Sequence, residues 1–182
     1  MSSSSDRNII TDIIKNERPA VVAEIGIWQC RLTKCLLKEC GDIITNYWAV
    51  DPWKEIKDVN KDYERDMDRY VSMTEESWDN AYFKACKLMR YFTQLHVIRA
   101  DSIVASKIFP KDHFDLVFID ADHRYDFVLA DIKAWTPLVK KGGLVTGHDY
   151  KIQHKGTMRA VDECFGRDVN IIENSSIWVY RK

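Results

Sequence analysis

The sequence carries no excess of charge of either sign. Its 182 residues include 27 lysines and arginines against 28 aspartates and glutamates, which gives a formal net charge of −1. Proteins dedicated to nucleic-acid binding normally have a basic excess or a basic stripe on one face. The charge balance therefore gives no support for a nucleic-acid partner.

Long apolar runs and closely paired cysteines are also missing. No stretch approaches the ~18 apolar residues of a membrane span, and the N-terminus has no apolar signal-peptide core. We therefore expect no contact with a membrane. The five cysteines form no C-x-x-C pair, which excludes zinc-ribbon and thioredoxin-like sites. We interpret them as reduced thiols of a cytoplasmic protein, because disulfides are rare in that compartment.

What the sequence does contain is the composition of one folded domain. Hydrophobic residues make up 46% and charged residues 30% of the chain, which is an ordinary globular balance. The length predicts a single domain that buries its core without a disulfide or a structural metal. We divide the chain into an N-terminal leader and helix, residues 1–18, and a domain over residues 19–182.

The order of the predicted elements indicates the architecture of this domain. Helical spacing of apolar residues predicts helices over 6–17, 31–40, 75–92, 101–109, 125–135 and 157–165. Apolar runs predict strands over 20–25, 47–50, 95–99, 114–119 and 144–146. Two last strands, 168–172 and 177–180, lie too close together for a crossover helix and predict an antiparallel hairpin. The pattern is that of a Rossmann-like, doubly wound α/β sheet, mostly parallel.

The loop after the first strand is short of glycine. In sheets of this kind ligands bind beyond the carboxyl ends of the strands, and a dinucleotide fingerprint would place three glycines here. Only Gly26 is present, and Trp28 stands where a pyrophosphate would need room. The loop therefore disfavours NAD or FAD and a nicotinamide oxidoreductase, whereas a nucleoside without a pyrophosphate would fit. A plain strand turn at a glycine is the alternative interpretation.

Acidic residues follow the second and third strands. Asp51 is placed to accept hydrogen bonds from ribose hydroxyls, although an Asp-Pro turn would give the same pattern. Asp101 could accept from an exocyclic amine. Asp101 and Ser102 equally suit the N-cap of a helix.

The fourth and fifth strands end in the densest cluster of polar residues. Asp120, Asp122 and His123 follow the fourth strand, and His148 and Asp149 follow the fifth. Adjacent parallel strands lie about 4.8 Å apart, so Asp120 and Asp149 could converge on one cation. Two carboxylates with open water positions suit Mg²⁺ or Mn²⁺. Solvated loop acids remain the alternative.

Together these segments resemble the class I S-adenosylmethionine (SAM)-dependent methyltransferases, and among them the small domains related to macrocin-type O-methyltransferases. The resemblance runs over about residues 20–180. It is carried by VAEIGIWQCRLTKCLL (22–37), WAVDPW (48–53), the stretch 115–150 and HKGTMRAVDECF (154–165). Relatives usually have glycine where Cys30 stands, a small-for-small change that we expect to be tolerated.

The resemblance also implies roles for individual residues. An acid after the fourth strand and one after the fifth bind Mg²⁺ in metal-dependent relatives, and these match Asp120 and Asp149. His123 matches a general base, and we expect Asp120, His123 and His148 to be catalytic. Some relatives carry Glu or Asn beside the second acid, where this chain has His148 and Tyr150, so the third metal ligand is left open. Residues expected at the cofactor are Glu24, Gly26, Trp28, Asp51, Asp101, Ser102 and Asp120.

The predicted function is transfer of a methyl group from SAM to a hydroxyl of a small acceptor, with assistance from Mg²⁺ or Mn²⁺. A sugar hydroxyl and a phenol are both candidate acceptors. The alternatives are a cephalosporin-hydroxylase-like enzyme and a non-catalytic nucleoside-binding domain on the same fold. We interpret residues 52–74 as a lid over the acceptor or as a solvated charged helix. The N-terminal helix either covers the same cleft or forms a homodimer contact.

Overall fold

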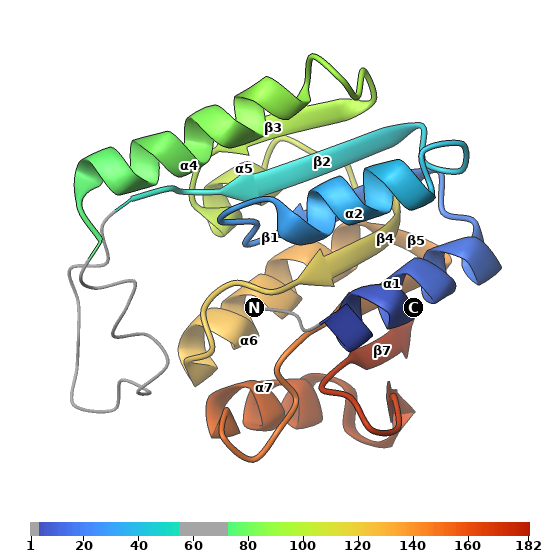
Figure 1. The fold of residues 1–182 in the computed structure, drawn as a ribbon. Coiled ribbons are helices and arrows are strands. Elements are labelled where there is room, and N and C mark those ends of the chain that lie inside the picture. The colour runs from blue at the N-terminus through green and yellow to red at the C-terminus, as the bar shows by residue number, and fades with distance from the viewer. Residues whose placement is uncertain (1–3, 55–72) are drawn as a thin grey trace.

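A single sheet of seven strands runs through the computed structural model, which describes residues 4–54 and 73–182 (Figure 1). Its strand order is β3-β2-β1-β4-β5-β7-β6. The strands are β1 (Val21–Ile25), β2 (Asn46–Asp51), β3 (Leu95–Arg99), β4 (Phe114–Ile119), β5 (Val139–Gly147), β6 (Val169–Ile171) and β7 (Trp178–Arg181).

The pairing of the strands confirms the predicted Rossmann-like sheet. β1 pairs in parallel with both β2 and β4, β2 with β3, and β4 with β5. β7 is antiparallel to β5 and β6, as the predicted hairpin requires. The chain order reverses between β1 and β4, and in such sheets this switch point is where ligands bind.

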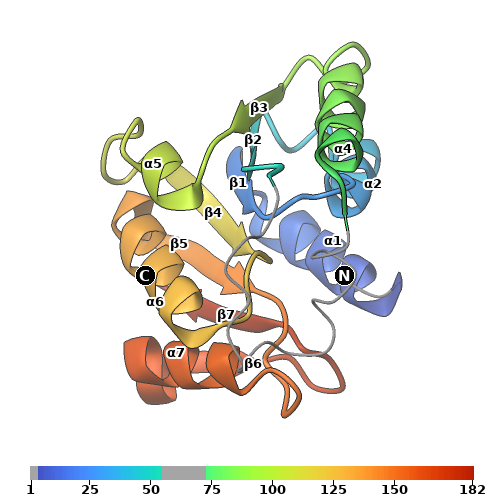
Figure 2. The ribbon, with the colours of Figure 1, turned by 90° about the vertical axis from the view of Figure 1, so that its left-hand side faces the viewer.

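Helices cover both faces of the sheet, which Figure 2 shows from its edge. One face carries α1 (Ser4–Glu17), α2 (Arg31–Glu39) and α4 (Glu75–Leu88); the other carries α5 (Ser102–Ser106), α6 (Tyr125–Trp135) and α7 (Lys155–Phe165). Among the described residues, every helix is too short or too polar to cross a membrane.

Two apolar cores result, one on each face, because successive strand residues point to opposite sides. On β1, Val22 packs with Ile10 and Ile14 of α1, whereas Ala23 packs with Trp135 of α6. All five of these side chains are 1% exposed or less. The strands are thus buried on both faces, which explains why they read as continuous apolar runs.

The fifth strand was predicted too short. β5 begins at Val139 rather than at residue 144, and Gly142 and Gly143 lie inside it. The register against β4 shifts between Phe114 and Leu116, and Gly142 takes a positive φ of 82° there. A glycine-containing bulge interrupts the strand without ending it. The predicted helices 75–92 and 101–109 were too long, since α4 ends at Leu88 and α5 at Ser106.

The predicted lid, residues 52–74, lies mostly outside the described residues. Pro52 to Lys54 and Met73 to Thr74 are described, and Thr74 caps α4 by accepting a hydrogen bond from the backbone N–H of Ser77. This N-cap is the usual role of threonine at a helix start.

Candidate active site

The loops after β1 and β4 touch each other at the switch point. Gly26 has φ 86°, and a Cβ at this residue would overlap the backbone oxygen of Asp120 and lie 2.5 Å from the Cα of Ala121. The Asp120 N–H donates to the carbonyl oxygen of Ile25 at 2.8 Å. Only glycine allows both the conformation and the approach. The predicted cofactor loop and the acid after β4 are therefore in direct contact.

Asp51 holds the loop after β1 in place. Its Oδ2 accepts the backbone N–H of Trp28 at 2.8 Å, and its Oδ1 accepts that of Trp53 at 2.7 Å. The indole N–H of Trp53 donates to the carbonyl oxygen of Trp28 at 2.9 Å, which closes the network. Burial raises the pKa of Asp51, partly offset by these N–H groups. Each carboxylate oxygen keeps a further lone pair with which it can accept another hydrogen bond.

Residues in this loop and its neighbour adopt left-handed backbone conformations. Trp28 and Trp53 both have φ 39°, and Cys30, at the N-cap of α2, has φ 58°. Glycine adopts such conformations without strain, whereas other residues do so at a cost. The left-handed φ of Cys30 gives a physical reason for the glycine that the resemblance leads us to expect at this position.

Other residues expected at the cofactor already have protein partners. Asp101 is exposed and accepts from Lys54 Nζ at 2.6 and 2.9 Å, and its side chain does not cap α5. Ser102 Oγ donates to Asp131 and accepts from the Trp135 indole N–H at 2.8 Å.

Glu24 is fully buried beside α2. Its Oε2 accepts from Thr33 Oγ1 and from the Tyr47 hydroxyl, each at 2.6 Å. Burial raises the pKa of Glu24 to about 7, although these two hydrogen bonds lower it. A carboxyl with such a pKa changes its charge near neutral pH.

Asp120, His148 and Asp149 come together where β4 and β5 end. His148 Nδ1 lies 3.0 Å from Asp149 Oδ2 and 3.6 Å from Asp120 Oδ1. The ligand atoms of the three residues all lie within 4.8 Å of one another. Asp149 has φ 62°, a left-handed conformation that aspartate tolerates better than most residues. We call these three residues the first trio.

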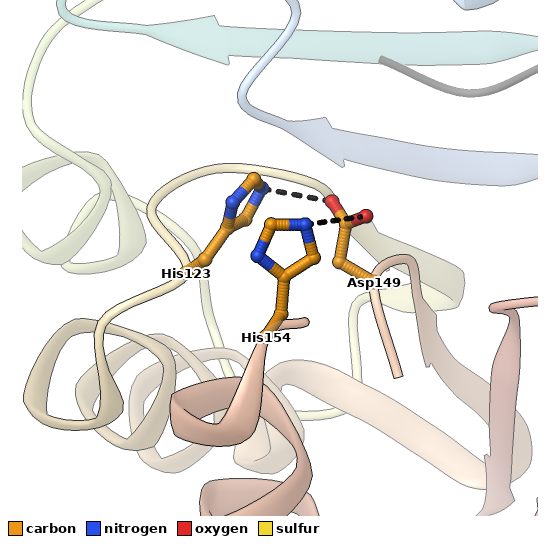
Figure 3. Close-up of side chains that lie close together, drawn as sticks. All are labelled: His123, Asp149 and His154. Atoms are coloured by element: carbon orange, nitrogen blue, oxygen red, sulfur yellow. Dashed lines mark ion pairs between the residues drawn. The ribbon is translucent and has the colours of Figure 1, made fainter. Parts of the chain in front are cut away.

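A second trio shares Asp149 and adds a residue that the sequence analysis did not single out. In Figure 3, His123 and His154 both point at the Asp149 carboxylate. His123 Nε2 is 2.8 Å from Oδ2, and His154 Nε2 is 3.5 Å from Oδ1. A Cβ on Gly156 would overlap the carbonyl oxygen of His123, so this glycine lets the start of α7 approach the loop after β4.

Charges in the cluster set the protonation of its members. Burial by itself raises the pKa of Asp149, but His123 and His148 outweigh it and hold that pKa well below its usual range. Burial lowers the pKa of His148, yet Asp149, Asp120 and Asp6 together raise it to about 9. Lys151 Nζ also contacts Asp149 Oδ1, at 2.8 Å. Asp149 is therefore a carboxylate surrounded by cationic or potentially cationic groups.

The first trio has the donor chemistry of a divalent-cation site. His148 Nδ1 and Asp149 Oδ2 are fully buried and lie 3.0 Å apart, yet within the described part of the chain neither makes a hydrogen bond of suitable geometry. Buried polar atoms without hydrogen bonds call for an explanation, and a shared ion supplies one. Two carboxylates and one imidazole suit Mg²⁺ or Mn²⁺, the imidazole favouring Mn²⁺.

Sequence comparison identifies the family. A family model described as a methyltransferase domain matches residues 23–150, which include all of the strand ends described above. The chain belongs to this methyltransferase family. It is a class I SAM-dependent methyltransferase, as the resemblance implied. A comparison with curated proteins finds no match.

Solved structures of other methyltransferases share the fold of this methyltransferase. The SAH-bound Podospora anserina methyltransferase PaMTH1 is 12% identical with a TM-score of 0.68, covering 100% of this chain and 80% of that one. The O-methyltransferase NovP is 21% identical with a TM-score of 0.61, covering 97% and 77%. An O-methyltransferase from Bacillus cereus in complex with SAH is 12% identical with a TM-score of 0.59, covering 100% and 83%. Identities this low are informative about the fold alone.

A cavity of about 390 Å³ lies between the loop after β1 and α4 of this methyltransferase. Its volume is typical of sites for small molecules. Its walls are formed by Trp28 and Met73 together with the polar residues Gln29, Ser77, Asn80 and Lys84.

Proposed function

We propose that this methyltransferase methylates a hydroxyl group of a small molecule, with a divalent cation, Mg²⁺ or Mn²⁺, held by Asp120, His148 and Asp149. The observation that carries the proposal is the first trio, whose ligand atoms lie within 4.8 Å of one another at the ends of β4 and β5. The cavity of about 390 Å³ beside Trp28 supports a small-molecule ligand.

The chemistry of a hydroxyl acceptor requires both alignment and removal of a proton. SAM supplies a methyl group already activated on a sulfonium, so the protein has chiefly to align the acceptor, which can remove roughly 7–11 kcal/mol of the barrier. A bound divalent cation would lower the pKa of the acceptor hydroxyl. The first trio supports this role because its two carboxylates are largely buried and both lie close to His148 Nδ1.

His123 is our candidate for the proton acceptor. Its Nε2 is 2.8 Å from Asp149 Oδ2, and its side chain is 13% exposed, so it borders the cluster without being sealed in it. The proton of the acceptor hydroxyl would pass to the imidazole as the oxygen–methyl bond forms and the methyl–sulfur bond breaks. Asp149 would orient the ring of His123 and stabilise its protonated form.

The cofactor would lie over the ends of β1, β2 and β3. We propose that Asp51 accepts the ribose hydroxyls through the lone pairs that the loop N–H groups leave free. Asp101 would exchange Lys54 for the adenine amine, and Ser102, whose hydroxyl is engaged with Asp131, would contribute backbone atoms. Gly26, Trp28 and the buried Glu24 would shape the end of the site nearest Asp120.

Methyl transfer from isotope-labelled SAM to a panel of sugars and phenols tests the proposal. We expect transfer that Mg²⁺ or Mn²⁺ stimulates and EDTA removes, and we expect Asp120→Asn to lose this stimulation. Asp122→Asn is the matched control, because Asp122 stands in the same loop but pairs with Arg124 at 2.6 Å.

Three results would contradict the proposal. If Asp120→Asn keeps full metal stimulation, the cation is bound elsewhere. If EDTA leaves the wild-type rate unchanged, no cation takes part in the reaction. If SAM binds but no hydroxyl compound is methylated, a non-catalytic nucleoside-binding domain becomes the better account.

A further inference from the structure

We propose that Asp6, in the first turn of α1, is a positioning residue of the cation site, which it completes by fixing the ring of His148. This inference rests on the proposed cation at Asp120, His148 and Asp149. It gives the N-terminal helix a role in the active site that its sequence did not reveal.

Two residues from other parts of the chain contact the outer ring nitrogen of His148, Nε2. Asp6 Oδ2 lies 3.1 Å from His148 Nε2, and Ser176 Oγ, in the segment before β7, lies 2.9 Å from the same nitrogen. The other ring nitrogen, Nδ1, faces Asp149 and Asp120. The side chain of His148 is only 2% exposed, so the ring has no room to turn away.

A neutral imidazole can offer a lone pair to a cation at one nitrogen only when the other nitrogen carries the proton. A carboxylate that accepts the Nε2–H selects this tautomer, orients the ring and makes Nδ1 a better electron donor. Metal-bound histidines almost always have such a partner on their outer nitrogen. Asp6 supplies it here from a residue 142 positions away in the chain.

The second trio lacks this support at one of its histidines. His123 Nδ1 is buried, and it has no hydrogen-bond partner among residues 4–54 and 73–182. Of His123 and His148, only His148 therefore has a partner on its outer ring nitrogen, as a metal ligand usually does. This difference favours the first trio as the cation site.

Contacts other than that of Asp6 also hold α1 against the rest of the chain. Ile10 and Ile14 are fully buried in the core shared with α2, and Glu17 at the far end of the helix accepts from Arg181 at 2.7 Å. Figure 1 shows α1 running alongside the sheet, away from the side toward which β4 points. Effects on the cation and effects on helix docking can therefore be separated by variants at the two ends.

The test is a calorimetric titration of the full-length chain with Mn²⁺ in three versions. We expect Asp6→Asn, which keeps the shape but removes the charge, to weaken Mn²⁺ binding roughly 10- to 100-fold. Glu17→Gln, which loosens the same helix far from the site, should bind Mn²⁺ as the wild type does. Hydrogen exchange gives a second measurement: Mn²⁺ should protect the amides of Ile9 to Ile14 in the wild type and in Glu17→Gln, and much less in Asp6→Asn.

The outcomes separate this inference from the proposed function. If the wild type and Asp6→Asn bind Mn²⁺ equally, the inference fails and the proposed cation site stands. If Glu17→Gln weakens binding as much as Asp6→Asn, the effect is one of helix docking and the inference fails as well. If the wild type binds neither Mn²⁺ nor Mg²⁺, the proposed cation and the inference fail together.

Discussion

Gly26 allows the loops after β1 and β4 to touch, because it has no side chain to collide with the second loop. Alanine there would have to adopt φ 86° and would meet the backbone of Asp120 and Ala121, which cannot move aside cheaply. We expect Gly26→Ala to destabilise the fold by about 3 kcal/mol or more and to abolish SAM binding. Urea unfolding and calorimetry with SAM measure the two effects.

Gly142 offers a matched control for this substitution. It has a similar φ of 82°, but within the described residues a Cβ there would meet no atom closer than 4 Å. Gly142→Ala should therefore cost only the backbone strain, about 1–2 kcal/mol, and leave SAM affinity unchanged. Equal losses in the two variants would show that the contact between the loops contributes nothing.

Asp131 on α6 should make stability depend on pH. It is 5% exposed, and burial raises its pKa to about 7, although the hydrogen bond from Ser102 opposes the shift. A carboxyl whose folded pKa is raised stabilises the fold below its unfolded pKa of about 4 and loses this contribution as the pH rises through about 7. The free energy of unfolding of the wild type should therefore fall as the pH rises between these two pKa values.

Asp131→Asn removes this titration. The free energy of unfolding of the wild type, relative to the variant, should fall by a few kcal/mol between about pH 5 and about pH 8, at ~1.4 kcal/mol for each pKa unit. Urea unfolding at both pH values measures the difference. A difference that stays constant over this range would mean that Asp131 is ionised throughout.

Among the elements, the loop after β1 is held in place by the side chain of Asp51. Asp51 accepts N–H groups of Trp28 and Trp53, and both tryptophans have left-handed φ values. We expect Asp51→Ala to lower SAM affinity about tenfold or more. Each buried hydrogen bond that is lost leaves an unsatisfied N–H donor in the loop. The SAM affinity of Asp51→Asn, which keeps one acceptor oxygen, should lie between those of the wild type and Asp51→Ala. Calorimetry with SAM and SAH measures this, and wild-type affinity in Asp51→Ala would exclude the residue from the cofactor site.

The strands and helices could be predicted because their signals are local. Apolar runs and helical spacing depend on neighbours within a few residues, and β1 to β4 appear within two residues of their predicted ends. The bulge in β5 could not be predicted, since Gly142 and Gly143 also suit a turn. What keeps them in the strand is pairing with the backbone of Lys182, which donates to Gly143 and accepts from Gly142.

At the scale of the whole molecule, the alternation of elements fixes which strand ends meet. It was therefore foreseeable that Asp120 and Asp149 would lie on adjacent strands. Two further residues at the cluster were not foreseeable. His154 stands before α7 rather than at a strand end, and Asp6 reaches His148 only because α1 packs across the sheet. Such contacts depend on tertiary packing, which no local pattern records.

The contacts that join α1 to the rest of the chain have a kinetic consequence. Asp6 meets His148 across 142 positions and Glu17 meets Arg181 across 164. Contacts between such distant residues carry a large loop-closure entropy and form after the local ones. Contacts that form late mainly slow unfolding and change the rate of folding little. We therefore expect substitutions that weaken these contacts of α1 to speed unfolding more than they slow folding.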